Sequence, residues 1–472
     1  MKRVAWWFLG YVVVFCSIDV YRWKIWSFGT DTGAFARAIL NTFSGSYDSA
    51  EQASHYAFHW SPIIGVLYPL VALTHSPLSI QFAQVLLVGA SVFPFYAIVR
   101  RYSGEPFASR VALLALFYPA LMSIAFEEFH EMAFFPLVLF SLVWAIDAGR
   151  WAIFFLCSIA AVLIREDVLI AVAVLGAALV VAGAVQRSNE GLLFLAPRAP
   201  AATMLAGGWL VLLSLGVFAA YFKLVIPAVG GWRPTHFYSY PFADGPVALL
   251  AALVTQPLAV VREIANYKRL SYLLEVFVPL LFLPLRSVWF LVALPGLLIV
   301  LLSSEGIVWR MGEHYAGLFA PQLLLGTAAT LVAMSRRRSH VAQRALSFVF
   351  GLFALFLIAF NPMHIAHYLT PPYRDLADAR RAFAVVPRAA AVTTHDEWYS
   401  HYALVYPNAA NSADLPTQYA VFADDYTPSG TLSVAERWTQ RQTALGRFRV
   451  IAQFGRVKVY ERRNLLIPSG EP

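Results

Sequence analysis

Charged residues are scarce in this chain, and their scarcity argues against a soluble enzyme. Only 13% of the 472 residues are charged, while 59% are apolar, whereas soluble globular proteins carry about 25% charged residues. The charges are also unevenly distributed, because residues 1–369 hold 40 of the 62 and residues 370–472 hold the other 22. The sequence therefore predicts an all-α polytopic membrane domain over 1–369 and a small soluble α/β domain over 370–472.

Long basic runs and cysteines are also scarce. The short cluster Arg336 to Arg338 adjoins an apolar stretch and is typical of a membrane topology signal, so we expect no nucleic-acid partner. Cys16 and Cys157 lie in apolar stretches and indicate nothing about the redox compartment. Lys2 and Arg3 precede an apolar run, as in a signal peptide, but no small-residue cleavage site follows. We therefore expect this run to be retained as the first membrane helix.

Apolar runs of nearly spanning length recur along residues 1–369. A membrane-spanning helix needs about 20 apolar residues, and eleven runs approach this length: 4–21, 79–99, 107–125, 132–147, 151–164, 168–185, 203–226, 272–285, 287–303, 315–334 and 342–360. Residues 58–73 are apolar but interrupted by prolines, so we expect a helix that lies at the membrane surface. Residues 245–262 are a second candidate for such a position. The sequence thus predicts about eleven transmembrane helices, with the lipid bilayer as their surroundings.

Basic residues in short loops predict the orientation, because cytoplasmic loops are enriched in Lys and Arg. We place Lys2 and Arg3 inside. The predicted inner loops then contain Arg100, Arg101, Arg150, Arg187, Arg198, Arg286 and Arg336 to Arg338. An odd number of spans puts the C-terminal domain on the other side. We expect a multi-pass protein of the bacterial inner membrane, with a cytoplasmic N-terminus and an extracytoplasmic C-terminal domain.

Five short polar clusters lie at the predicted outer ends of the spans. They are Thr30 to Phe35, His55 to Pro62, Glu127 to Glu131, Arg165 to Asp167, and Glu313 to Tyr315. Ionisable groups beside membrane spans are costly and usually face a cavity or a partner. We therefore expect one outward cavity that these clusters line. The alternative is that they belong to polar loops that water solvates.

Three of these clusters suggest chemistry, and each has a structural alternative. Asp31 begins a short amphipathic helix, where it could act as a base or only as an N-cap. His130 has three carboxylates beside it and could bind a metal ion, but metal-type spacing does not repeat elsewhere and we expect no cofactor. Arg165 suits a phosphate because its planar guanidinium can hold two oxygens at once. Its alternative role is to pair with Glu166 or Asp167.

Five motifs, in their order along the chain, resemble those of a bacterial and archaeal family of multi-pass membrane proteins. That family is known as the domain of unknown function 2079. The motifs are Asp31-Thr32-Gly33, His59-Trp60-Ser61-Pro62, Glu128-Phe129-His130, Arg165-Glu166-Asp167, and His314-Tyr315 with Pro321. That family is itself similar to the GT-C superfamily glycosyltransferases, integral membrane enzymes that use polyprenyl-phosphate sugars. Those enzymes place an essential Asp in the first outer loop, and Asp31 matches that position.

The resemblance implies an enzyme that moves a sugar from a polyprenyl-phosphate donor to an extracytoplasmic acceptor hydroxyl, with inversion at the sugar carbon. The acceptor is unknown. Asp31 would be the base, with Glu128 and His130 also catalytic because they position the acceptor or tune Asp31. The substrate-binding residues would be His59, Arg165, Glu166, Asp167, His314 and Tyr315. The alternatives are a transporter or flippase of a lipid-linked or anionic solute, and a non-catalytic membrane scaffold.

The C-terminal segment has the alternating pattern of a small α/β domain. The pattern predicts helices over 376–386 and 433–445, strands over 390–394 and 418–423, and a hairpin of 448–454 with 457–461. We see no catalytic constellation in it and expect His395 to Glu397 to form a solvated turn. The domain would cap the cavity or bind the acceptor.

The predicted orientation can be tested with single cysteines introduced at Ser44, Ser188 and Ser429. A membrane-impermeant thiol reagent added to intact cells should label the cysteines at Ser44 and Ser429, because both lie in predicted outer segments. It should not label the one at Ser188. Labelling of Ser188 without the other two would contradict the orientation.

Overall fold

A computed structural model describes residues 1–48, 50, 53–185, 194, 199–233, 239–244, 246–361, 365–371, 376–406, 408–410, 417–423 and 434–463. Four residues used above for topology, Arg187, Ser188, Arg198 and Ser429, lie outside this part of the chain. The chain forms two compact units. The first consists of Met1–Cys16, Tyr56–Ile64 and Phe82–His364, and the second consists of Ser17–His55, Gly65–Gln81 and Ile365–Pro472.

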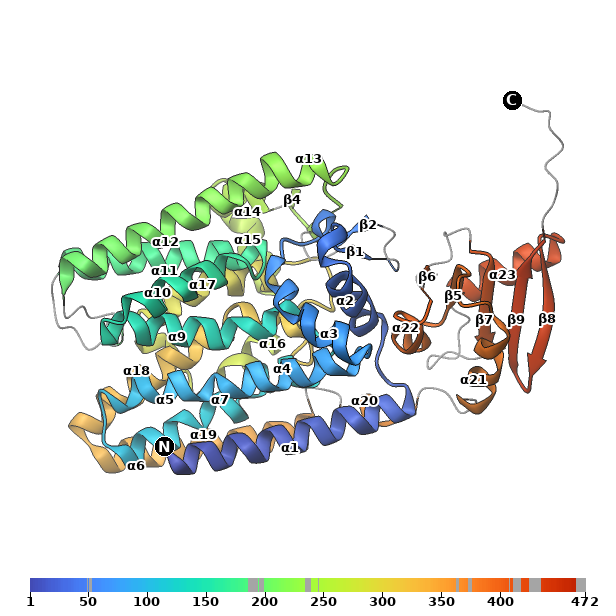
Figure 1. Ribbon diagram of the computed structural model, residues 1–472. Coiled ribbons are helices and arrows are strands. Elements are labelled where there is room, and N and C mark those ends of the chain that lie inside the picture. The colour runs from blue at the N-terminus through green and yellow to red at the C-terminus, as the bar shows by residue number, and fades with distance from the viewer. Residues whose placement is uncertain are drawn as a thin grey trace. The chain divides into compact units, whose positions relative to one another are not determined.

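The first unit is built mainly from apolar α-helices (Figure 1). A backbone in hydrocarbon must satisfy its hydrogen bonds within its own segment, which favours helices here. Helix α1 (Lys2–Ile25) begins in the first unit and ends in the second. Helix α4 (Leu78–Ala90) begins in the second unit and ends in the first. The others are α5 (Val92–Arg100), α6 (Glu105–Ala112), α7 (Leu114–Phe117), α8 (Pro119–Phe126), α9 (Phe134–Ala148), α10 (Trp151–Val162), α11 (Glu166–Val185), α12 (Pro200–Ala220), α13 (Ile226–Ala228), α14 (Pro246–Thr255), α15 (Pro257–Ile264), α16 (Tyr267–Phe277), α17 (Trp289–Leu301), α18 (Ala320–Arg337) and α19 (Ser339–Leu355). A small hairpin also belongs to this unit, and each of its strands, β3 (Ser239–Tyr240) and β4 (Ala243–Asp244), has two residues.

Among the described residues, six helical segments are long and apolar enough to cross a membrane. They are Lys2–Ile25, Leu78–Arg100, Glu131–Ala148, Glu166–Val185, Pro200–Ala228 and Ser339–Ala359. The pair Glu105–Phe117 and Pro119–Phe126 would be a seventh, bent by 50° where Pro119 interrupts the helix. Helical residues occur in each of the eleven predicted runs, but α10, α16 and α17 are shorter than a full span. Helix α16 ends at Phe277, inside the predicted run 272–285, and α18 is not among the six segments. The predicted all-α membrane domain is therefore confirmed, and the protein is a multi-pass membrane protein.

The C-terminal part of the second unit is a five-stranded sheet with the strand order β6-β5-β7-β9-β8. Strand β5 pairs in parallel with β6 and β7, whereas β9 runs antiparallel to β7 and β8. The strands are β5 (Val392–Thr394), β6 (Ala409–Ala410), β7 (Tyr419–Ala423), β8 (Phe448–Phe454) and β9 (Val457–Arg462). The helices are α21 (Leu376–Val385), α22 (Asp396–Tyr402) and α23 (Val434–Ala444). The predicted α/β domain is confirmed with nearly the predicted element bounds.

Apolar side chains from the sheet and its helices form the core of this domain. Val392, Val421 and Val459 of three adjacent strands are fully buried and join Phe383 of α21 and Trp398 of α22 in one cluster. Short elements from earlier in the chain complete the second unit. They are α2 (Thr30–Leu40), α3 (Tyr68–Thr74), α20 (Ile365–Leu369), and a small hairpin of β1 (Tyr47–Asp48) and β2 (Ala53–Ser54).

Within the second unit, α2 packs directly on α22. The Gly33 N–H donates to the Ser400 hydroxyl oxygen at 2.8 Å, and the Ser400 hydroxyl donates to the carbonyl of Gly29. The buried Arg37 guanidinium donates to the carbonyls of Ala403 and, at 3.2 Å, Tyr406. A Cβ on Gly33 would lie 2.7 Å from the Ser400 Cα, so this contact requires glycine.

The prediction of a solvated turn at His395 to Glu397 is wrong for His395, whereas Asp396 is exposed in the first turn of α22. His395 is only 3% exposed, and its Nε2 accepts a hydrogen bond from the Ala423 N–H at 3.1 Å. Burial lowers the pKa of His395 to about 3, which keeps the imidazole neutral. The residue thus joins α22 to strand β7.

Replacement of Gly33 by Ala should destabilise the second unit. The added methyl group meets the backbone of α22, and overpacking of this kind costs about 1–3 kcal/mol. Thermal unfolding in detergent and protease sensitivity of the segment 17–55 would measure the effect. The control is Gly208→Ala in α12, where the added Cβ meets nothing within 4 Å. Equal stability of the two variants would contradict the described contact.

Candidate functional site

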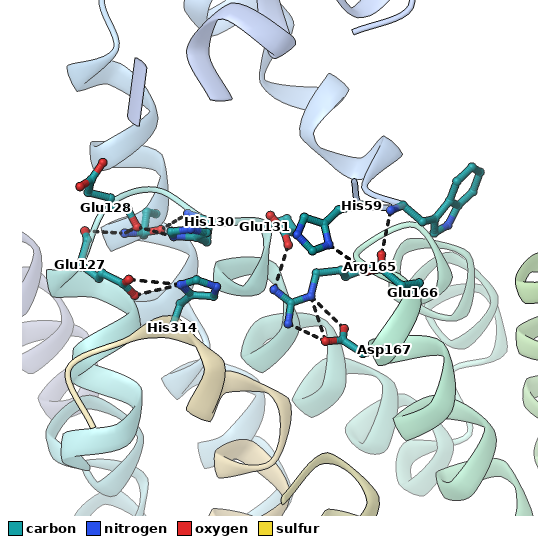
Figure 2. Close-up of polar contacts among 11 residues, drawn as sticks. His59, Glu127, Glu128, His130, Glu131, Arg165, Glu166, Asp167 and His314 are labelled. Carbon is teal, nitrogen blue, oxygen red and sulfur yellow. Dashed lines mark hydrogen bonds and ion pairs between the residues drawn. The ribbon is translucent and has the colours of Figure 1, made fainter. Parts of the chain in front are cut away.

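The loop after α8 brings buried polar side chains into the first unit (Figure 2). The helix ends at Phe126, and Glu127 continues as extended backbone. Gln84 of α4 holds this loop, because its amide donates to the carbonyls of Glu127 and Glu128, both at 3.1 Å. The Gln84 side-chain oxygen also accepts the His130 N–H at 2.9 Å. Gln84 is fully buried, so its amide group and the backbone of this loop satisfy one another's hydrogen bonds away from water.

Glu127, His130 and His314 form a candidate metal centre. One ligand atom from each of the three buried residues lies within 4.8 Å of the others. The two imidazole rings stack with their centroids 3.5 Å apart. Nδ1 of His314 donates to the Glu127 carboxylate at 3.1 Å, and Nδ1 of His130 donates to the Glu128 carbonyl at 3.1 Å. Such bonds orient histidine ligands and set their tautomers.

The ionisation of this triad also suits a metal ion. Burial, followed by the charges of His130, Arg165 and His59, holds the pKa of His314 well below its usual value. His314 is therefore a neutral imidazole, which is the form that binds metal. Two imidazoles with one carboxylate are a set typical of zinc. The residues thus fit a divalent cation, and this triad would hold it.

A second network surrounds Arg165, directly before α11. Its Nε donates to the two Asp167 carboxylate oxygens at 2.9 and 3.0 Å, and its Nη2 donates to Asp167 at 2.5 Å. Its Nη1 donates to Glu131 at 3.3 Å. Arg165, Asp167 and Glu131 are each only 1% exposed. The two carboxylates therefore fix the plane of the guanidinium.

A third contact joins His59 and Trp60 to the start of α11. Nδ1 of His59 donates to Glu166 at 2.8 Å, and the Trp60 N–H donates to the other Glu166 oxygen at 2.8 Å. The Trp60 indole donates to the Val162 carbonyl at 2.7 Å. Burial opposes the charged form of His59, but the Glu166 carboxylate outweighs it and raises the pKa of His59. The His59 imidazole is therefore protonated more readily than an ordinary histidine.

The charges of these networks do not cancel. The buried carboxylates are Glu127, Glu131, Glu166 and Asp167, each at most 5% exposed. When His59 is protonated, it and Arg165 supply two positive charges against these four negative ones. Two negative charges remain if all four carboxylates are ionised. Unbalanced buried charge is costly, and a divalent cation at the triad would neutralise it.

The structure brings most of the predicted site residues together, in two groups that Figure 2 shows. One group contains His59, Arg165, Glu166 and Asp167; the other contains His130 and His314, whose neighbour Tyr315 lies with its ring centroid 4.0 Å from that of His314. The Glu128 side chain points away from His314 in Figure 2. Asp31 belongs to the second unit, where it is exposed in the first turn of α2.

Three residues of these networks were absent from the predicted site. Glu127 rather than Glu128 contacts His314, and Glu131 contacts Arg165. Both lie in the acidic cluster that the sequence singled out, but spacing does not decide which carboxylates point inward. Gln84 could have been noticed as an amide within a long apolar run, because polar groups in membrane helices usually have a partner.

The apolar helices and the buried polar networks define a multi-pass membrane protein with a charged centre inside its helical unit. Residues 23–454 match the family described as Predicted membrane protein (DUF2079). The chain belongs to this family, which confirms the resemblance seen in its motifs. A comparison with curated proteins finds no match.

Solved structures that are similar to this chain include the following three. One is the crystal structure of ArnT from Cupriavidus metallidurans bound to undecaprenyl phosphate, at 14% identity and TM-score 0.49, over 98% of this chain and 99% of that one. Another is an oligosaccharyltransferase of Archaeoglobus fulgidus with Zn and sulfate, at 13% identity and TM-score 0.45, over 87% and 67%. The third is the A. fulgidus oligosaccharyltransferase AglB in complex with an inhibitory peptide and a dolichol-phosphate. It has 13% sequence identity and a TM-score of 0.39, and the match covers 89% of this chain and 69% of that one. These values are low, so the chemistry of this chain has to be inferred from its own residues.

Metal analysis of the purified protein tests the triad. The protein should retain a divalent ion, preferentially zinc over magnesium, because nitrogen ligands favour zinc. His130→Ala and His314→Ala should each lower the affinity at least tenfold (an order-of-magnitude expectation for a lost contact near the ion). Glu313→Gln, which removes a neighbouring carboxylate outside the triad, is the control and should bind like the unaltered protein. Equal metal content in all variants would contradict the site.

Proposed function

We propose that this protein is a membrane glycosyltransferase of the inner membrane. It would move a sugar from a polyprenyl-phosphate donor to the hydroxyl of an extracytoplasmic acceptor. The observation that carries the proposal is the buried centre of four carboxylates, Arg165 and paired histidines inside an apolar helical unit. Such groups are expensive in a membrane protein and typically mark a functional site.

The donor needs positive charge at its phosphate, because negative charge develops there as the sugar leaves. The Arg165 guanidinium is held in one plane by Asp167 and Glu131, and an oriented fork suits phosphate oxygens. His59, charged and oriented by Glu166, would assist, with His314 and Tyr315 also on the donor side. A divalent ion held by Glu127, His130 and His314 would act as a Lewis acid when bound.

The acceptor needs a base, because its hydroxyl loses a proton as it attacks. Asp31 would take this proton while the acceptor oxygen bonds to the anomeric carbon and the bond from that carbon to the phosphate oxygen breaks. The lipid phosphate leaves with the bonding electrons, and one displacement inverts the sugar carbon. Glu128 and His130 would position the acceptor.

The lipid donor also accounts for the membrane location. Its phosphate would lie at the interface while its chain stays in hydrocarbon. Two of the similar structures hold lipids of this chemical class, undecaprenyl phosphate and dolichol-phosphate, but the proposal rests on the side chains above. The N-terminus would be cytoplasmic and the C-terminal domain extracytoplasmic, where it would cap the site or bind the acceptor.

Transport or flipping of a lipid-linked anion is the second candidate. The 50° break between Glu105–Phe117 and Pro119–Phe126 favours it, because transporters often build sites from interrupted helices. Sugar transfer by purified protein in detergent would decide for the enzyme. Movement of the lipid across vesicles without transfer would decide for the transporter.

Asp31→Asn should keep donor binding and lose turnover. Loss of one general base typically costs about 10²–10⁴-fold in rate, whereas Asn keeps the size of the side chain, and Asp31 lies exposed in the first turn of α2, after its N-cap Gly29. The matched control is Asp396→Asn, which alters an exposed acid in the first turn of α22 and should leave transfer unchanged. Full activity of Asp31→Asn would end its assignment as the base.

Arg165→Lys should weaken binding of a polyprenyl-phosphate sugar as well as transfer. Lysine keeps the positive charge opposite Asp167 and Glu131 but loses the planar fork. Arg165→Ala should also lower stability, because it leaves two buried carboxylates without their cation. Binding and thermal unfolding would be measured together. Unchanged donor affinity in well-folded Arg165→Lys would restrict Arg165 to a structural role.

A further inference from the structure

An open groove of about 510 Å³ lies between α6 and α19 in the first unit. Figure 1 shows these two helices in the same region of the unit. Arg110 lines the groove from α6, and the residues of α19 that line it include His340, Gln343, Arg344, Phe348 and Gly351. None of these residues belongs to the polar networks described above, and none of them is used in the proposed transfer.

The side chains of this groove carry charge of one sign. Two arginines and one histidine line it, and the residues that line it include no carboxylate. The nearest acid along α6, Glu105, is already engaged by the Met1 amino group at 2.6 Å and by Arg100 at 3.0 Å. Arg336 and Arg337 add further positive charge in the last turn of α18, two residues before α19 begins. An anion is therefore the complementary ligand.

The groove also has an apolar half. From His340 to Gly351, at about 1.5 Å per residue, it follows α19 for roughly 16 Å, which is about half the thickness of the hydrocarbon core. Helix α19 belongs to a segment long and apolar enough to span the membrane. Phe348 is 67% exposed, and a Cβ added to Gly351 would meet nothing within 4 Å. The basic end thus lies at a helix terminus and the apolar end lies deeper along the span.

We propose that this groove binds one anionic phospholipid. Its phosphodiester would lie against Arg110 and Arg344, and an acyl chain would follow Phe348 and Gly351. Basic pockets between membrane helices are suited to anionic headgroups, and arginine binds phosphate oxygens in pairs. A small soluble anion would use only the basic half, so the apolar half points to a lipid. The arginines in the last turn of α18 place this lipid in the leaflet next to the predicted inner loops.

Two groove variants and a matched control test the groove. Arg110→Gln with Arg344→Gln removes the charge, whereas Gly351→Leu fills the apolar half and leaves the charge intact. The control, Arg150→Gln with Arg286→Gln, removes two exposed arginines that do not line the groove. The altered side chains are exposed or face open space, so the variants should fold, and thermal unfolding would verify this.

Binding would be titrated with dioleoyl phosphatidylglycerol in detergent micelles, with dioleoyl phosphatidylcholine and glycerol 1-phosphate as comparison probes. The unaltered protein and the control should bind phosphatidylglycerol more tightly than either comparison probe. The double arginine variant should bind it roughly tenfold or more weakly, given the contribution of each basic residue near an anionic lipid. Gly351→Leu should also weaken it.

Three results would overturn the proposal. Equal phosphatidylglycerol affinity in the control and both groove variants would show that the lipid binds elsewhere. Equal affinity for phosphatidylcholine would show that the arginines do not recognise the headgroup charge. Glycerol 1-phosphate binding as tight as that of phosphatidylglycerol, unaffected by Gly351→Leu, would show a free-phosphate site rather than a lipid site.

Discussion

The first unit depends on keeping the Arg165 guanidinium both charged and buried. Removing a partner from a buried ion pair typically costs about 3–5 kcal/mol, because the remaining charge is left without compensation. Glu131 supplies that compensation from the segment after α8, and Asp167 supplies it from the first turn of α11. Their positions therefore tie the segment after α8 to the start of α11. Gln84 completes the arrangement by satisfying the backbone of the same segment.

The fold was largely predictable because hydrocarbon allows few backbone conformations. A long apolar run must satisfy its own backbone hydrogen bonds, so it becomes a helix wherever it lies in the sequence. The tail was predictable for a related reason, since alternation and the turn at Gly455 determine the β8–β9 hairpin locally. The lengths of individual spans were less predictable. A proline such as Pro119 indicates where a helix can break, but the size of the bend depends on packing that the sequence does not reveal.

The sequence predicted which regions of the chain form the site, but not which side chains contact one another there. The sequence marked the acidic loop, yet only the extended backbone at Glu127 decides that this residue and not Glu128 reaches His314. The pairing of Arg165 with Glu131 joins loops 34 positions apart, and no local pattern encodes such a pairing. The packing of α2 on α22 was missed for the same reason. Gly33 belongs to a motif that the sequence singled out, but nothing in that motif points to Ser400, and their hydrogen bond spans 367 positions.

That last contact has a consequence for the order in which the protein can mature. A ribosome adds about 5–20 residues per second, so on the order of tens of seconds separate the emergence of Gly33 from that of Ser400. During this interval the buried face of α2 has no α22 to cover it. Any cell that makes this protein must therefore shield an N-terminal helix until the last quarter of the chain has been synthesised.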